Sequence, residues 1–427
     1  MSSGLPFLST YDPPQASEGT LDPVGLFQVG NRLASELVPA VRERMQRVRF
    51  LTPITVGSFV TTGLQVDPDQ PQSPPFMVWE WLVVEAILRT FDGEADLWGV
   101  PGTLVTRRAI AQHGYLDHRS YLKIARIYGF HGVYKRVAIQ LGLVDLDLQP
   151  RGERSQALAE AWSRDMGLGP FDPDGPLLSK WRDTVVRATS RNPASTQVGW
   201  QEEDWRELAE AFAPWLIGTR ERRLLRELLL DEQRMGALPV YWKLQERFGD
   251  QTYTDRAMLH AVRIERPEYA PLIDAIDAYE MFSRAIEDGF DLVRAAATGR
   301  DLTGLRLADM AEDPDFVAIA ERTPGLCERA RQTLTVQGLE MPSTFEQRFS
   351  SFLEPMPPGR FALEIARHHE RIQQGKGDKR PWFDWLEDGE KLYMRASYRI
   401  GRPEVDPEQY VHDYRAQPIR LFYQDLQ

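Results

Sequence analysis

Hydrophobic side chains recur every three or four positions along much of the chain, which is the spacing of a helix that buries one face. The pattern is clearest over residues 272–293, where the steps alternate between four and three if the polar Ser283 takes one place. This stripe predicts a long helix that lies in a bundle core or against a partner helix. Its apolar members are Leu272, Ile276, Tyr279, Ile286, Phe290 and Val293.

Weaker helical patterns fill most of the remaining chain, and prolines divide them. The segment DPDQPQSPP at 67–75 ends one helical region, and we expect further breaks at Pro314, Pro324 and Pro342. Residues 391–400 alternate between apolar and polar positions, as a strand does. Helices are predicted within residues 31–64, 76–91, 202–232 and 238–249, and in a C-terminal segment that ends near Gly375.

The segment after residue 100 combines three short helical patterns with a small ribbon. The helical patterns are TRRAIAQHG at 106–114, RSYLKIARIYG at 119–129 and VYKRVAIQLG at 133–142. Next, Val144, Leu146 and Leu148 alternate with aspartates, and PRGE at 150–153 supplies a tight turn, so we expect a hairpin. This order resembles the winged-helix superfamily over roughly residues 100–165, which implies that the third helix enters a major groove of DNA.

Together these patterns predict a mainly α protein, with multi-helix bundles, an embedded winged-helix module and a small C-terminal β-hairpin element. A chain of 427 residues is too long for one ordinary core, so we expect two or three domains. Composition divides the chain into an N-terminal irregular or helical segment (1–75), a helical region with the winged-helix-like module (76–165), a helical bundle domain (202–350) and a basic, aromatic α+β segment (355–427).

Charge is distributed unevenly along the chain. The formal net charge is −12, which argues against a non-specific coat for nucleic acid. Residues 105–136 nevertheless hold seven basic side chains and a single acidic one, Asp117. Such a local excess is typical of a surface that binds a polyanion. The alternative is a solvated helix face whose counter-charges come from elsewhere in the fold.

The resemblance and the local charge together define a candidate nucleic-acid site. Lys135, Arg136 and Gln140 on the third helix would reach bases or phosphates, and basic residues on the preceding helix would hold the DNA backbone. Basic residues at the expected wing tip would reach flanking phosphates. The complete set is Arg107, Arg108, Arg119, Lys123, Arg126, Lys135, Arg136, Gln140, Arg151 and Arg154.

A secondary basic and aromatic patch is expected in the C-terminal segment. It comprises Lys376, Lys379, Arg380 and Trp382, because basic residues interleaved with rings can hold a nucleic-acid backbone while the rings stack on bases. The alternative is a structural helix followed by a surface turn and an edge hairpin, which is the more common role for such a segment.

No pattern of catalytic residues indicates an enzyme, although the enzymatic status stays open. The neighbouring His368 and His369 diverge by about 100° on a helix and rarely bind one ion, and one acidic helix face (Asp274, Asp277 and Glu280) is typical of a solvated surface. We expect no catalytic residue, no metal and no cofactor. The single cysteine, Cys327, could be a stabilised thiolate at a helix start but is more often inert.

The predicted function is that of a non-catalytic DNA-binding or scaffolding subunit of a bacterial multi-protein complex, with double-stranded DNA and other protein subunits as partners. Low cysteine use fits a cytoplasmic location, and no apolar run is long enough for a membrane span. The organisation resembles accessory proteins of bacterial DNA-defence (anti-phage) systems, although no motif carries that likeness. The alternatives are a helical interaction protein whose winged helix binds no nucleic acid, and a nuclease subunit with dispersed carboxylates.

Overall fold

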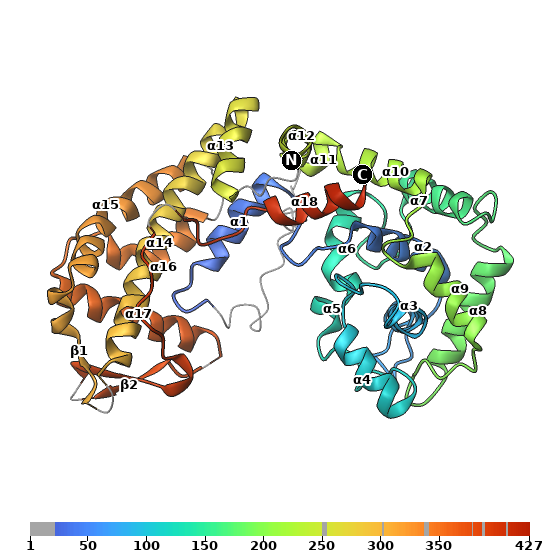
Figure 1. Cartoon of the computed structure of the whole chain (residues 1–427), viewed down its shortest axis with the longest axis horizontal. Helices are drawn as coiled ribbons and strands as arrows, with labels where there is room; N and C mark the ends of the chain where they lie inside the picture. The colour runs from blue at the N-terminus through green and yellow to red at the C-terminus, as the bar shows by residue number, and fades with distance from the viewer. Residues whose placement is uncertain are drawn as a thin grey trace, which may run out of the picture. The chain divides into compact units, whose positions relative to one another are not determined.

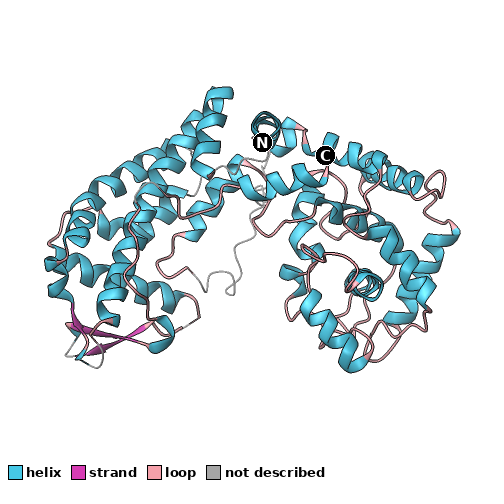
Figure 2. Ribbon diagram, viewed as in Figure 1, coloured by secondary structure: helices cyan, strands magenta, loops and turns pink. Residues whose placement is uncertain are grey.

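The computed structural model describes residues 22–249, 254–300, 303–336, 341–377, 379–386, 389–406 and 409–427. These residues form two compact units, each of which is discontinuous in sequence (Figure 1). Unit 1 contains the described residues from 22 to 37 and from 254 to 414, and unit 2 contains those from 38 to 249 and from 415 to 427. Helices dominate both units, and the three strands form one small antiparallel sheet (Figure 2). The mainly α fold class with a small C-terminal hairpin is confirmed.

The division of the chain into units differs from the segments expected from composition. Segments 1–75, 202–350 and 355–427 each cross a boundary between the units. Of the expected segments, 76–165 is the one that lies wholly within one unit, unit 2. Among the described residues, no helix is both long and apolar enough to cross a membrane.

Unit 1 is organised around α14, which spans Ala270–Thr298. Every position of the predicted stripe is buried, including Ser283, so the long core helix is confirmed. Gly289 on α14 allows Ile365 of α17 to pack closely, because a Cβ there would lie 2.8 Å from the Ile365 side chain. The other helices of this unit are α1 (Phe27–Leu37), α13 (Asp255–Glu265), η3 (Pro267–Tyr269), η5 (Leu307–Glu312), α15 (Pro314–Val336), α16 (Met341–Phe349), η6 (Ser350–Phe352), α17 (Pro358–Gly375) and η8 (Ala396–Tyr398).

Two expectations for unit 1 need correction. Pro324 does not break the chain, because it lies inside α15. The strand predicted over 391–400 is limited to β3 (Lys391–Met394), after which the chain forms η8. β3 is the central strand of the sheet, and it pairs with β1 (Leu305–Arg306) on one side and β2 (Phe383–Leu386) on the other.

Unit 2 contains α3 (Pro75–Phe91), the helix predicted over 76–91, and α3 is buried from Pro75 to Leu88. A helix that is apolar nearly all round is typical of a core position. Aromatic side chains from four helices fill that core: Trp181 and Phe212 are in ring contact with each other and with both Trp79 and Trp162. The remaining helices are η2 (Val48–Phe50), α2 (Leu51–Thr61), α4 (Thr103–His113), α5 (Ala125–Tyr128), α6 (Phe130–Gln140), α7 (Gly152–Asp165), α8 (Pro176–Thr189), α9 (Glu202–Phe212), α10 (Thr219–Leu229), α11 (Glu232–Met235), α12 (Leu238–Phe248) and α18 (Ala416–Asp425).

The segment that resembles a winged helix has the expected first and third helices, α4 and α6, but differs between and after them. The second predicted helix is reduced to the single turn of α5. The reason is local, because the Asp117 carboxylate accepts the backbone N–H groups of Arg119 and Ser120 and holds a turn there.

The expected hairpin is reduced to one antiparallel bridge between Val144 and Pro150. Its turn lies at residues 145–149 instead of PRGE, because Gly152 already begins α7. Within the turn, Leu148 has φ of +59° and the Asp145 carboxylate accepts the N–H groups of Asp147 and Gln149. A winged-helix relationship therefore stays a prediction, with a shortened second helix and a minimal ribbon.

Candidate functional site

The exposed basic side chains of α4, α5 and the loop between them form the candidate nucleic-acid interface. Arg108, Arg119, Lys123 and Arg126 are exposed, and none of them makes an ion pair with any residue that the structure describes. We call these four residues the cationic surface. Arg151 is also exposed, and it is the residue that precedes α7.

Three other members of the predicted set are engaged within unit 2. Arg107 makes a bidentate ion pair with Asp92, at 2.6 and 2.8 Å, where α3 ends. Arg154 donates to Asp231 at 2.7 Å and to the carbonyl of Leu141, so it lies in α7 and not at a wing tip. The Gln140 side chain donates to the carbonyl of Arg234. This bond does not favour the prediction that Gln140 reaches bases or phosphates.

Lys135 and Arg136 on α6 are half-buried. Burial lowers the pKa of Lys135, while the charges of Asp147 and Asp145 act in the opposite direction and Arg126 adds to the lowering. The same electrostatic contacts place Lys135 near both Arg126 and the two aspartates of the 145–149 turn. The exposed positive charge of this region therefore comes chiefly from α4, α5 and the loop, and less from α6.

One buried carboxylate holds the segment that carries Lys123 and Arg126. Glu80 of α3 is fully buried, and its Oε1 accepts the hydroxyl of Tyr121 at 3.0 Å. Its Oε2 accepts the backbone N–H of His131 at 2.8 Å and lies 2.7 Å from His131 Nδ1. Gly129 leaves room for this carboxylate, because a Cβ at that position would overlap with Glu80 Oε1. Sequence patterns gave no sign of Glu80, which stands in an apolar helix.

The secondary patch is mainly structural. Lys376 is half-buried, donates to the carbonyl of Asp22, and has its pKa lowered by burial. The Trp382 ring stacks on Tyr398 at 4.7 Å, and its backbone N–H donates to His369. Lys379 is half-buried and Arg380 is exposed. These contacts favour the structural interpretation of this patch over a stacking platform.

His368 and His369 bind backbone carbonyls and remain neutral. His368 Nε2 lies 2.8 Å from the carbonyl of Val24, and His369 Nδ1 lies 2.7 Å from that of Pro23. Burial lowers the pKa of His368 to about 4 and that of His369 to about 3. No cluster of metal-binding side chains is found among the described residues.

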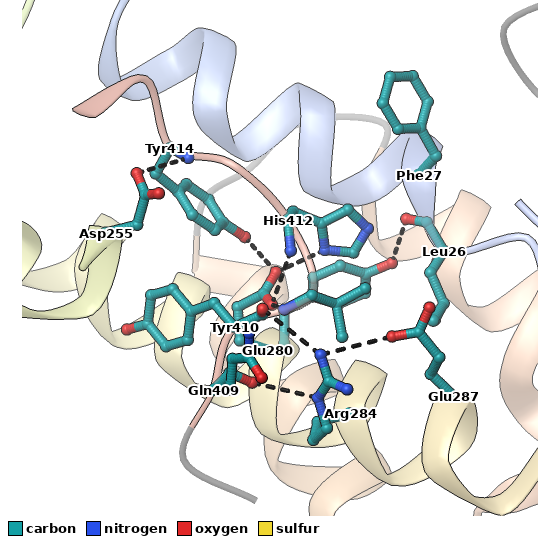
Figure 3. A network of polar contacts seen from close by, with 12 residues as sticks. Leu26, Phe27, Asp255, Glu280, Arg284, Glu287, Gln409, Tyr410, His412 and Tyr414 are labelled. Atoms are coloured by element: carbon teal, nitrogen blue, oxygen red, sulfur yellow. Dashed lines mark hydrogen bonds and ion pairs between the residues drawn. The ribbon is translucent and has the colours of Figure 1, made fainter. Parts of the chain in front are cut away.

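A second buried polar network lies in unit 1, and it was missed by sequence reasoning (Figure 3). The Glu280 carboxylate of α14 accepts bonds from a segment that follows 130 residues later: from the N–H of Val411, His412 Nδ1 and the Tyr414 hydroxyl. Glu280 was expected on a solvated acidic face, and that expectation is wrong, because its side chain is 1% exposed. The network fastens residues 410–414 to α14.

Cys327 lies in the interior of α15 and is fully buried. Burial, with a smaller contribution from Glu328, raises the pKa of its thiol to about 12. The expected position at a helix start is therefore wrong, and the inert cysteine that the sequence favoured agrees with the burial of the thiol.

In comparisons with known proteins, no family model, no curated protein and no solved structure matches this chain.

Proposed function

We propose that this chain binds the phosphate backbone of duplex DNA through the cationic surface, as a non-catalytic subunit of a bacterial multi-protein complex. The observation that carries the proposal is that Arg108, Arg119, Lys123 and Arg126 are exposed and make no ion pair with another described residue, on a chain of net charge −12. Exposed basic side chains on an acidic protein provide a local attraction for polyanions.

The positions of these four basic side chains favour contacts with the DNA phosphate backbone over contacts with the edges of the nucleobases. The side chains on α6 that would enter a groove are half-buried or bonded within unit 2, whereas the exposed ones lie on α4, α5 and the loop. Contacts to phosphate position a protein on DNA but carry no sequence information. We therefore expect binding with little sequence preference. If all four bases contact phosphates, the logarithm of the affinity should fall against the logarithm of salt concentration with a slope of about −3.6.

The test is binding of a fluorescent 25-base-pair duplex, followed by anisotropy between about 25 and 200 mM salt. Lys123→Glu with Arg126→Glu should weaken binding roughly tenfold or more and reduce the salt slope by about 2. A matched control is Arg206→Glu with Arg223→Glu. These two arginines are also exposed in unit 2, and they pair with Glu202 and Glu227 on their own helices. Equal losses in both double variants, or no binding by the original chain at low salt, would overturn the proposal.

A protein-docking role is the second candidate function, and one feature of the 145–149 turn favours it. Leu146 is 75% exposed at the tip of this turn. In the same turn, Leu148 adopts φ of +59°, which is uncommon for a bulky residue. The adjacent Asp147 is also exposed and would be repelled by phosphate. Under this alternative, the Lys123 and Arg126 double variant would leave DNA retention unchanged, whereas Leu146→Asp would lose binding of a protein subunit.

A further inference from the structure

The Glu80 carboxylate joins the two ends of the segment 121–131, which carries two bases of the cationic surface. Tyr121 at one end and His131 at the other both bond to Glu80, whereas Lys123 and Arg126 between them are exposed. The intervening backbone forms only the four-residue helix α5, which is too short to be stable by itself. The path of the segment is therefore set by its attachments and not by its own helical structure.

The chemistry at Glu80 suits a clamp. The carboxylate faces the first turn of α6, where backbone N–H groups lack partners within the helix, and it satisfies one of them at His131. The pKa of the neighbouring Tyr121 hydroxyl is raised well above 10, first by burial and then by the negative charge of Glu80. The Tyr121 hydroxyl therefore stays protonated at neutral pH and donates to Glu80.

We infer that Glu80 is a positioning residue for the cationic surface: by holding Tyr121 and His131 on one carboxylate, it fixes Lys123 and Arg126 in the arrangement that meets DNA. The DNA part of this inference rests on the proposed function. The mechanical part, that Glu80 restrains residues 121–131, is independent of any ligand. Loss of the Glu80 hydrogen bonds should keep the charges of Lys123 and Arg126 but no longer fix their positions.

The mechanical part can be tested with trypsin, because Lys123 and Arg126 are themselves cleavage sites. Glu80→Gln keeps the size of the side chain but replaces one of the two acceptor oxygens by an amide N–H₂, so one of the two attachments loses its acceptor. We expect cleavage at Lys123 and Arg126 to become about tenfold faster, since a local opening that lacks one strong hydrogen bond is more populated. Tyr121→Phe should show a smaller increase, because it removes one of the attachments.

Glu85→Gln is the matched control. Glu85 is also a fully buried carboxylate of α3, but it bonds to Thr196 and Arg89 and not to the 121–131 segment. Urea unfolding of both variants gives their global stability. The inference holds if Glu80→Gln speeds cleavage at Lys123 and Arg126 and Glu85→Gln of similar stability does not. It is overturned if both variants speed cleavage at these sites in proportion to their loss of global stability.

The duplex assay then tests the link to DNA. We expect Glu80→Gln to weaken DNA binding about fivefold, although no basic side chain has been removed. The reason is that ordering residues 121–131 on binding now costs free energy. Faster cleavage with unchanged DNA affinity would overturn the positioning role. If the original chain binds no DNA, the proposed function fails, and the cleavage comparison still decides whether Glu80 restrains the segment.

Discussion

His412 Nδ1 lies 2.6 Å from Glu280 Oε1 in the interior of unit 1 (Figure 3). The imidazole ring stacks on Tyr279, and it packs so closely on α1 that a Cβ at Gly30 would lie 2.5 Å from the ring. The charged groups that act on His412 are Glu280, Asp22 and Glu287. A histidine thus enclosed makes the attachment of residues 410–414 dependent on pH.

The direction of that dependence follows from the pKa shifts of both partners. Burial alone would lower the pKa of His412, but the charge and hydrogen bond of Glu280 outweigh it, so that pKa is raised above 6.5. Burial would likewise raise the pKa of Glu280, but His412 and the donors of Tyr414 and Val411 lower it below 4.5. The stabilisation by the ion pair is therefore complete between pH 4.5 and pH 6.5, the ordinary pKa values of the two groups. It is lost at higher pH as His412 deprotonates, and in acid as Glu280 becomes protonated.

We predict that His412→Gln destabilises unit 1 by about 2 kcal/mol near pH 6 and by clearly less near pH 9. Thermal unfolding of both proteins at a series of pH values measures the difference. Tyr414→Phe is the control, because it also removes a donor to the Glu280 carboxylate. The pKa of the Tyr414 hydroxyl is raised well above 10, so this donor does not titrate between pH 6 and pH 9. Its cost should not change over this pH range. A pH-independent cost of His412→Gln would contradict the prediction.

The second prediction concerns the buried ion pair of Arg49 with Glu221 in unit 2. Both side chains are at most 2% exposed, and Arg49 Nε lies 3.0 Å from Glu221 Oε1. The guanidinium also donates to the carbonyls of Ala211 and Ala213, and Thr52 donates to Glu221, so the charges are fully bonded.

Arg49→Met should destabilise unit 2 by about 3–5 kcal/mol, because it leaves the Glu221 carboxylate buried without its cation. Arg49→Met with Glu221→Leu should recover part of this loss, since the double variant removes both charges. Urea unfolding followed by tryptophan fluorescence gives the values. A double variant that is less stable than Arg49→Met by the full cost of Glu221→Leu would show that the two residues act independently.

The sequence was most informative where a single helix determines its own burial. The stripe from Leu272 to Val293 predicted α14 correctly, including a buried place for Ser283, because spacing along one helix decides which side chains face the core. Pro324 shows the limit of such reasoning, since α15 continues through it. Packing against neighbouring helices can outweigh the local cost of a proline.

Contacts between distant segments could not be predicted in this way. Nothing near Glu280 in sequence indicates that His412 will reach it, and nothing near Glu80 indicates Tyr121 and His131. The basic region was located by charge counting. Only the structure separated the four residues of the cationic surface from Arg107 and Arg154, which make ion pairs, because the carboxylates of Asp92 and Asp231 come from other elements.

The third prediction is that Cys327 does not react in the folded protein. A thiol with a pKa of about 12 and no exposed surface supplies almost no thiolate at neutral pH. Labelling with a thiol reagent should therefore follow unfolding, with the same urea midpoint as the fluorescence transition of unit 1. Rapid labelling in the absence of urea would mean that α15 opens locally.

The last prediction concerns His368 and His369, whose effect on stability is opposite in sign to that of His412. Both have pKa values depressed by burial, to about 4 and about 3, so the unfolded chain binds protons more readily than the folded chain below pH 6.5. As the pH falls from 6.5 toward those values, each of these histidines therefore lowers the free energy of unfolding of unit 1, by about 1.4 kcal/mol per pH unit at most.

We expect His369→Gln to be less stable than the original chain at neutral pH, because it disturbs the bonds to Pro23 and Trp382. Its stability should nevertheless fall less steeply between about pH 6 and pH 4, since one titrating group has been removed. The measurement is the slope of unfolding free energy against pH for both proteins. An unchanged slope would show that His369 is already protonated in the folded state, which would require its Nε2 to release the Trp382 N–H.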